Sequence, residues 1–168
     1  VRIFLCRHGQ TENNRLRKVQ GARVDPPIND NGILQATNMG KALSRVNPRA
    51  GSFFSSNLKR AKMTAEIAAN QVDPAMAAPR QLSSLAEVDF GPAAEGQSIA
   101  LAKVGMEATA AAWAAGKIDY RPSEGGDSGR DVFVRAVESL RVLTNEAQAS
   151  NGSVVAVAHS AFLRILIA

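Results

Sequence analysis

The chain has 168 residues, 45% of them hydrophobic, so it is long enough to bury a core as one domain without disulfides. Its net charge is +5, but the basic residues are scattered and aromatic residues make up only 5%, which argues against nucleic-acid binding. No apolar stretch is long enough to cross a membrane, and the single cysteine, Cys6, cannot form an internal disulfide. We therefore expect one cytoplasmic domain over residues 1–168, with neither nucleic acid nor membrane as a partner.

The pattern of apolar residues and turn signals predicts alternating strands and helices. In chain order we expect a buried strand over 1–6, a helix carrying residues 33–43, a strand over 52–55, a helix over 58–68, a helix over 99–115, a helix carrying 132–143, a strand over 153–158 and a helix over 162–167. Asn29 or Asp30 is expected to cap the first helix, and Ser56 or Asn57 the second. This alternation predicts a three-layer α/β/α sandwich with a mainly parallel central sheet.

Both histidines of the chain directly follow a predicted strand: His8 after the first, His159 after the last. Ligands of parallel α/β sheets bind beyond the carboxyl ends of the strands, so both histidines are expected at a ligand site. Arg7 places beside His8 a guanidinium of the kind that pairs with phosphate oxygens. Arg60 falls in the first turn of a predicted helix, where free amide groups also attract anions. These residues together indicate a phosphate site in which an imidazole could attack phosphorus.

Ordered motifs run along essentially the whole chain. They are Leu5-Cys6-Arg7-His8-Gly9-Gln10-Thr11-Glu12, Asn14, the segments 17–21 and 25–27, Gly32, Gln35-Ala36, and the segments 55–65, 85–91, 95–96, 125–128 and 155–160. Their order and spacing resemble the histidine phosphatase superfamily, also called the phosphoglycerate mutase-like family. The resemblance implies that family's fold and a phosphatase activity.

The same resemblance implies residue roles. His8 would be the nucleophile that becomes phosphohistidine, and Glu87 would protonate the leaving oxygen and then help to activate water. Arg7, Arg60 and His159 would surround the phosphoryl group as further catalytic residues. The implied substrate-binding residues are Arg7, Asn14, Gln20, Gly21, Arg60, His159 and Ser160. The implied reaction is hydrolysis of a small phosphomonoester without cofactor or metal, under a lid formed by residues 91–121.

The chain departs from the family pattern at several positions. Ser160 and Asp127 stand where the family usually has Gly and Glu, and Pro92-Ala93-Ala94 occupies the place of a usual Trp. The last change leaves open how the loop that carries Glu87 is held. Relatives typically continue beyond the helix that follows His159, so the C-terminus is expected to be either compact or truncated. A homodimer is left open.

Two alternatives to a phosphatase also stay open. A mutase would use the same phosphohistidine, but mutases of the family carry extra arginines just after the proton donor, and here no arginine stands between Glu87 and Arg121. A non-catalytic phospholigand-binding domain would not need both a nucleophile and an acid. The substrate itself is open: the alanine-rich, weakly charged lid segment 91–121 favours a small or partly apolar leaving group, whereas Lys103 and Lys117 could grip a second anion.

Overall fold

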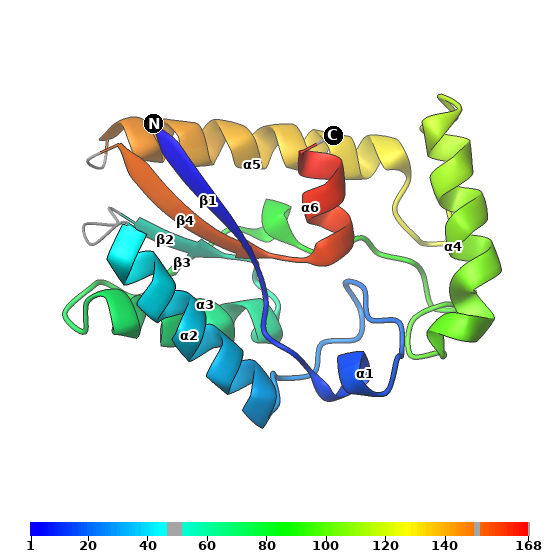
Figure 1. The fold of residues 1–168 in the computed structure, drawn as a ribbon. Helices are drawn as coiled ribbons and strands as arrows, with labels where there is room; N and C mark the ends of the chain where they lie inside the picture. Colours follow the sequence, from blue (N-terminus) through cyan, green and yellow to red (C-terminus); the bar gives the residue numbers. More distant parts are fainter. Residues whose placement is uncertain (47–51, 150–151, 168) are drawn as a thin grey trace.

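The computed structural model describes residues 1–46, 52–149 and 152–167, in which a parallel sheet lies between two helical layers (Figure 1). Its elements are β1 (Arg2–Arg7), α1 (Glu12–Arg15), α2 (Asp30–Val46), β2 (Ser52–Ser55), α3 (Lys59–Val72), β3 (Arg80–Gln81), the 3-10 turn η1 (Ser83–Leu85), α4 (Ile99–Ala114), α5 (Gly129–Ala149), β4 (Ser153–Ala158) and α6 (Ser160–Leu166). The strand order is β1-β4-β2-β3, and all three pairings are parallel. The predicted α/β/α sandwich is therefore confirmed.

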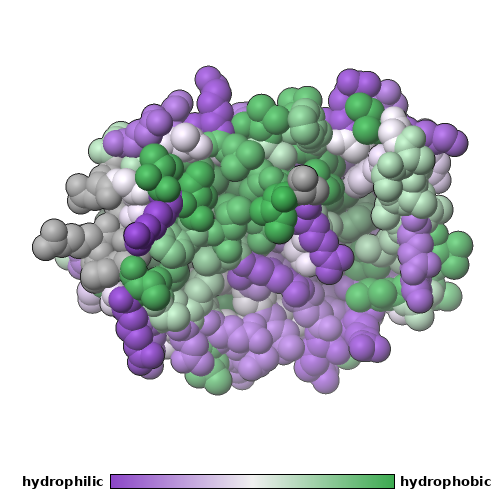
Figure 2. All heavy atoms as spheres, turned by 45° about the horizontal axis from the view of Figure 1, so that its top comes forward, coloured by the Kyte–Doolittle hydropathy of each residue, from purple (hydrophilic) through white to green (hydrophobic). Residues whose placement is uncertain are grey.

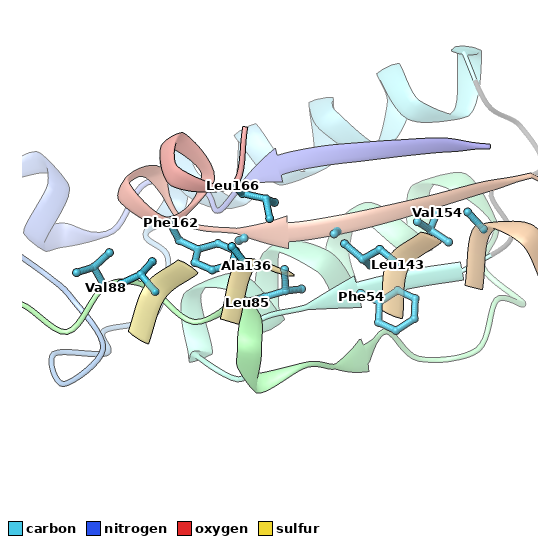
Figure 3. Packing of buried hydrophobic residues seen from close by; sticks show 12 residues of the cluster. Phe54, Leu85, Val88, Ala136, Leu143, Val154, Phe162 and Leu166 are labelled. Carbon is cyan, nitrogen blue, oxygen red and sulfur yellow. The ribbon is translucent and has the colours of Figure 1, made fainter. Parts of the chain in front are cut away.

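The core is organised around β4, which is buried along its whole length. Its side chains alternate between the two faces of the sheet, as the pleat of a strand requires. Val154, Ala156 and Ala158 pack in one cluster with residues of α5 and α6 (Figure 3), whereas Val155 and Val157 pack on the other side with residues of α2 and α3. A strand covered on both faces is continuously hydrophobic, which is why this segment was the clearest strand in the sequence.

The strand β1 lies at the edge of the sheet, and the expectation that it is buried was wrong. Its residues are exposed or only partly buried. Figure 2 shows hydrophobic residues gathered on the face formed by β1, α5 and α6. The large hydrophobic residues exposed on these elements and their flanks include Val1, Phe133, Val137, Leu140 and Ile167. A short apolar run predicts a strand but cannot distinguish a central strand from an edge strand.

The two helices on the opposite face begin in different ways. Asn29 caps α2, because its side-chain oxygen accepts the backbone N–H of Gly32 at 2.9 Å, as expected. Neither Ser56 nor Asn57 caps α3, whose N-cap is Leu58. Instead, the backbone N–H of Lys59 donates to Asp25 at 2.8 Å. The start of α3 is thus satisfied by a carboxylate from a distant loop, which local sequence could not reveal.

The segment between α3 and α5 contains α4, which was expected and begins at its cap Ser98. This helix lies to the side of the sandwich, beside the loops that follow β1 and η1 (Figure 1). The short β3 and η1 fall in a region that the sequence left irregular. No helix in the described part of the chain is long and apolar enough to cross a membrane.

Candidate active site

The parallel pairing of β1 with β4 brings the two histidines together. Arg7 is the register partner of Ala158, so the residues that follow them lie side by side. The backbone N–H of His8 donates to the carbonyl of Ala158 at 3.0 Å, and the rings of His8 and His159 are 5.1 Å apart between centroids. The expectation that both histidines meet at the carboxyl edge of the sheet is confirmed.

The ring of His8 is held in a defined state. Its Nδ1 lies 2.7 Å from the carbonyl oxygen of Gly9, and because a carbonyl can only accept, Nδ1 carries the proton. Burial lowers the pKa of His8 to about 3, and the charges of Arg60 and Arg7 act in the same direction against the Gly9 hydrogen bond. The imidazole is therefore neutral at neutral pH, and Nε2 carries the free electron pair.

Arg60, the second residue of α3, is completely buried. One terminal nitrogen donates to the carbonyl of Val24 at 3.1 Å and pairs with Asp25 at 3.2 Å, and the other donates to the carbonyl of Gly21 at 2.8 Å. Burial lowers the pKa of Arg60, but a guanidinium stays charged in proteins. The positive charge is therefore fixed beside the histidines and is paired with Asp25.

Several buried polar atoms of the described residues have no hydrogen-bond partner. They are Nδ1 and Nε2 of His159, Nε of Arg60, Nε2 of Gln20 and Oγ of Ser55. His159 is fully buried, and burial followed by the charge of Arg60 lowers its pKa well below the usual value. Buried polar groups are normally paired, so this concentration of unpaired donors indicates a site for a polar ligand.

A cavity of about 390 Å³ joins most of the predicted site residues. Arg7, His8, Asn14, Gln20, Glu87 and Ser160 all line it. The side chain of Arg7 is exposed, lines this cavity and has no hydrogen-bond or ion-pair partner in the described part of the chain. Lys18 and Arg164 also line the cavity, although the sequence did not single them out. The cavity is thus basic, with one buried carboxyl group.

That carboxyl group, Glu87, is 5% exposed. Its oxygens accept the backbone N–H groups of Val88, Ala161 and Phe162 at 3.0, 3.2 and 2.9 Å. Burial raises the pKa of Glu87 against the opposing pull of these three donors. The side chain therefore spans from its own loop to the first turn of α6, directly after His159, where it can carry a proton.

The loop that carries Glu87 is held by Arg135 of α5. This guanidinium donates to the carbonyl of Ala86 at 2.8 Å and pairs with Asp127 at 2.6 Å. Asp127 in turn accepts the backbone N–H of Asp89 at 3.0 Å. This arrangement answers the question raised by the missing tryptophan. Arg135 had no sequence signal, because nothing in a helical pattern reveals which distant loop an arginine reaches.

Two further residues hold Arg60 and the segment that follows His8 in place. Gly21 is packed against Glu95, and a Cβ atom at this position would lie 2.2 Å from a Glu95 carboxylate oxygen. Gly21 therefore helps to position Arg60 through its carbonyl oxygen, and its lack of a side chain leaves room for Glu95. Thr64, which the sequence analysis missed, accepts the backbone N–H of Gly9 at 2.9 Å and donates to the carbonyl of Arg60 at 2.6 Å.

The depressed pKa values of His8 and His159 predict how stability depends on pH. Protonation of these two histidines is disfavoured in the folded state. Their contribution to the stability of the folded protein is therefore fully present above pH 6.5, the usual histidine pKa, and is lost as pH falls toward the lower pKa of the folded state. We expect the free energy of unfolding to decrease between pH 7 and 5. His8→Gln and His159→Gln should each flatten this dependence by up to about 1.4 kcal/mol per pH unit.

Urea unfolding at several pH values within this range measures the effect, with each variant compared to the wild type at the same pH. An unchanged slope in both variants would mean that the two histidines ionise normally in the folded protein.

Part of this chain is similar in sequence to curated phosphatases. Fructose-2,6-bisphosphatase TIGAR of Xenopus tropicalis is 43% identical over 63 residues, which cover 38% of this chain and 22% of that protein. The broad-specificity phosphatase YOR283W of Saccharomyces cerevisiae is 39% identical over 67 residues, which cover 40% of this chain and 29% of that protein. The matched part thus spans less than a third of the length of these curated relatives.

Among solved structures, a phosphoglycerate mutase from Bacillus anthracis matches with a TM-score of 0.83 and 23% identity, covering 98% of this chain and 77% of that one. A mycobacterial hydrolase matches with a TM-score of 0.76 and 26% identity over 97% of this chain and 75% of that one. Residues 3–168 also match the sequence model of the histidine phosphatase superfamily (branch 1). The chain, with its paired histidines at the carboxyl edge of a parallel sheet, belongs to the histidine phosphatase superfamily.

Proposed function

We propose that this protein is a metal-independent phosphatase that hydrolyses small phosphomonoesters through a phosphohistidine on His8. The observation that carries the proposal is the neutral His8 ring, with its Nδ1–H bound to Gly9, in a cavity that also contains the buried carboxyl group of Glu87. The family relatives named as phosphatases support the same reaction.

In the first step, Nε2 of His8 attacks phosphorus as the bond from phosphorus to the ester oxygen breaks. The new N–P bond leaves an alkoxide, which needs a proton as it departs. Glu87 can supply this proton, because burial favours its protonated form. The products of the step are a phosphorylated His8, a free alcohol and a Glu87 carboxylate.

Cationic and uncharged hydrogen-bond donors stabilise the phosphoryl group during its transfer. Arg60 does not itself line the cavity, but its carbonyl and carboxylate partners hold it beside the histidines, and its Nε has no partner among the described residues and is available to donate to a phosphoryl oxygen. Arg7 supplies a second guanidinium, and the neutral ring of His159 supplies one N–H in either tautomer. Asn14 and Gln20 line the cavity and add uncharged amide groups. Ser160 contributes a hydroxyl group at its rim.

In the second step, the Glu87 carboxylate removes a proton from water, and the water oxygen attacks the phosphorus of phosphohistidine. The N–P bond breaks, inorganic phosphate forms, and neutral His8 is regenerated with protonated Glu87. Residues 91–121, which include α4, act in this scheme as the lid, since Ile99 and Met106 line the cavity. Hydrolysis is favoured over a mutase reaction because no arginine follows Glu87 before Arg121.

The central test is phosphate release from 4-nitrophenyl phosphate at mildly acidic pH in the presence of EDTA. We expect the wild type to remain active, and His8→Ala to lose activity by about 10³-fold or more, because no other group replaces the nucleophile. Circular dichroism of the variant serves as the folding control. Activity that disappears with EDTA, or that persists in His8→Ala, would contradict the proposal.

Glu87→Gln tests the proton donor. A nitrophenolate ion leaves without a proton, whereas the alkoxide of ethyl phosphate does not, so phosphorylation by ethyl phosphate should slow by about 10²–10⁴-fold and phosphorylation by the nitrophenyl ester much less. Single-turnover measurements isolate this step from water attack. Glu66→Gln, an exposed substitution on α3, is the matched control. Equal losses for both esters would assign Glu87 to positioning rather than to proton transfer.

A further inference from the structure

A second cavity, of about 400 Å³, lies between α4 and α6. Most of its wall is apolar and includes Val88, Phe90, Met106, Trp113, Ala161 and Ile165. None of the roles assigned above uses this space. Cavities of this size and lining typically hold the body of a small ligand.

This apolar cavity adjoins the cavity that contains His8. Phe90, Ile99, Met106, Ala161 and Arg164 line both. An ester that reaches from one to the other must therefore pass along this shared wall.

Residues that are hydrogen-bonded to Glu87 also line the apolar cavity. Glu87 accepts the backbone N–H groups of Val88 and Ala161, and both of these residues line the apolar cavity. A leaving oxygen that takes its proton from Glu87 is therefore next to the apolar cavity.

The charges at the junction fit an anionic ester that enters with an apolar group. Arg164 lines both cavities, is exposed, and has no hydrogen-bond or ion-pair partner in the described part of the chain. Lys103 lines the apolar cavity and is paired only loosely with Glu107, at 3.7 Å. A phosphate dianion is thus attracted to the junction. Beyond it, the polar side chains of the wall are Lys103, which pairs with Glu107, and Thr109, whose hydroxyl donates to the carbonyl of Gly105, so few partners are left for the hydroxyl groups of a sugar.

We propose that the cavity between α4 and α6 binds the leaving group, and that the substrates are monophosphate esters of alcohols with an apolar body about the size of an aromatic ring. This inference rests on the proposed function. It selects against polyhydroxylated leaving groups, because burying their hydroxyl groups without partners is unfavourable.

The test compares ethyl phosphate, glycerol phosphate and 2-phenylethyl phosphate. All three release an alkoxide of similar basicity, so differences in rate report binding of the leaving group rather than intrinsic reactivity. We expect kcat/KM for 2-phenylethyl phosphate to exceed that for the other two by about 10–100-fold. Similar values for all three esters would overturn the proposal while leaving the phosphatase assignment intact.

A matched pair of variants tests the location. Ala110 and Ala111 are neighbouring exposed residues of α4, but only Ala110 is among those that line the cavity. Ala110→Phe should fill the cavity and lower kcat/KM for 2-phenylethyl phosphate to the value for ethyl phosphate, so that the preference is lost. Ala111→Phe should retain the preference. A preference that survives Ala110→Phe would place the leaving group elsewhere, and the cavity would then serve another occupant.

Binding of phosphonates separates this inference from the proposed function. Calorimetry with 2-phenylethylphosphonate and ethylphosphonate requires no turnover. Tighter binding of the phenylethyl compound, lost in Ala110→Phe, supports the cavity assignment even if no ester is hydrolysed. Equal affinities of the two compounds overturn it whatever the enzymatic activity.

Discussion

The parallel pairing of β1 with β4 is the interaction on which the site depends. Its register makes His8 and His159 neighbours, and the hydrogen bond from the His8 N–H to Ala158 continues the ladder up to His8 itself. β4 is buried on both faces, so its end cannot move without disturbing the three core clusters that it joins. Ring geometry at the site is therefore a consequence of sheet geometry rather than of flexible loops.

Burial of unpaired polar groups is the second constraint. Arg60 and His159 are fully buried and keep nitrogen atoms without partners among the described residues, an arrangement that costs stability in the free protein. The same burial keeps both imidazoles neutral, which suits one of them to attack phosphorus. Under the proposed function, a phosphoryl group that reached these nitrogen atoms would supply their missing partners.

Sequence could predict the parts of the site that follow from strand order. Two histidines after two strands of a parallel sheet must meet at one edge, and an arginine in the first turn of α3 must lie near it. Glu87 was different, because a loop acid has no periodic signal and its role came only from the family resemblance. The three N–H groups that hold it come partly from α6, more than 70 positions away along the chain.

The features that sequence could not predict depend on such long-range contacts. Asp25 replaces the expected local cap of α3, and Arg135 supports the Glu87 loop from the N-terminal part of α5. The partly exposed position of β1 also escaped prediction, because an apolar run has the same composition at the edge of a sheet as in its centre. These differences leave the expected site in place and explain how it is held.

Trapping of the phosphorylated protein tests directly whether His8 carries the phosphoryl group during the reaction. Enzyme mixed with 4-nitrophenyl phosphate is quenched in alkali, where phosphohistidine survives, and is then mapped by peptide mass spectrometry and ³¹P NMR. We expect an acid-labile phosphoryl group on Nε2 of His8, because Nδ1 is occupied by its bond to Gly9. Turnover without a phosphorylated enzyme, or a phosphoryl group on another residue, would contradict this expectation.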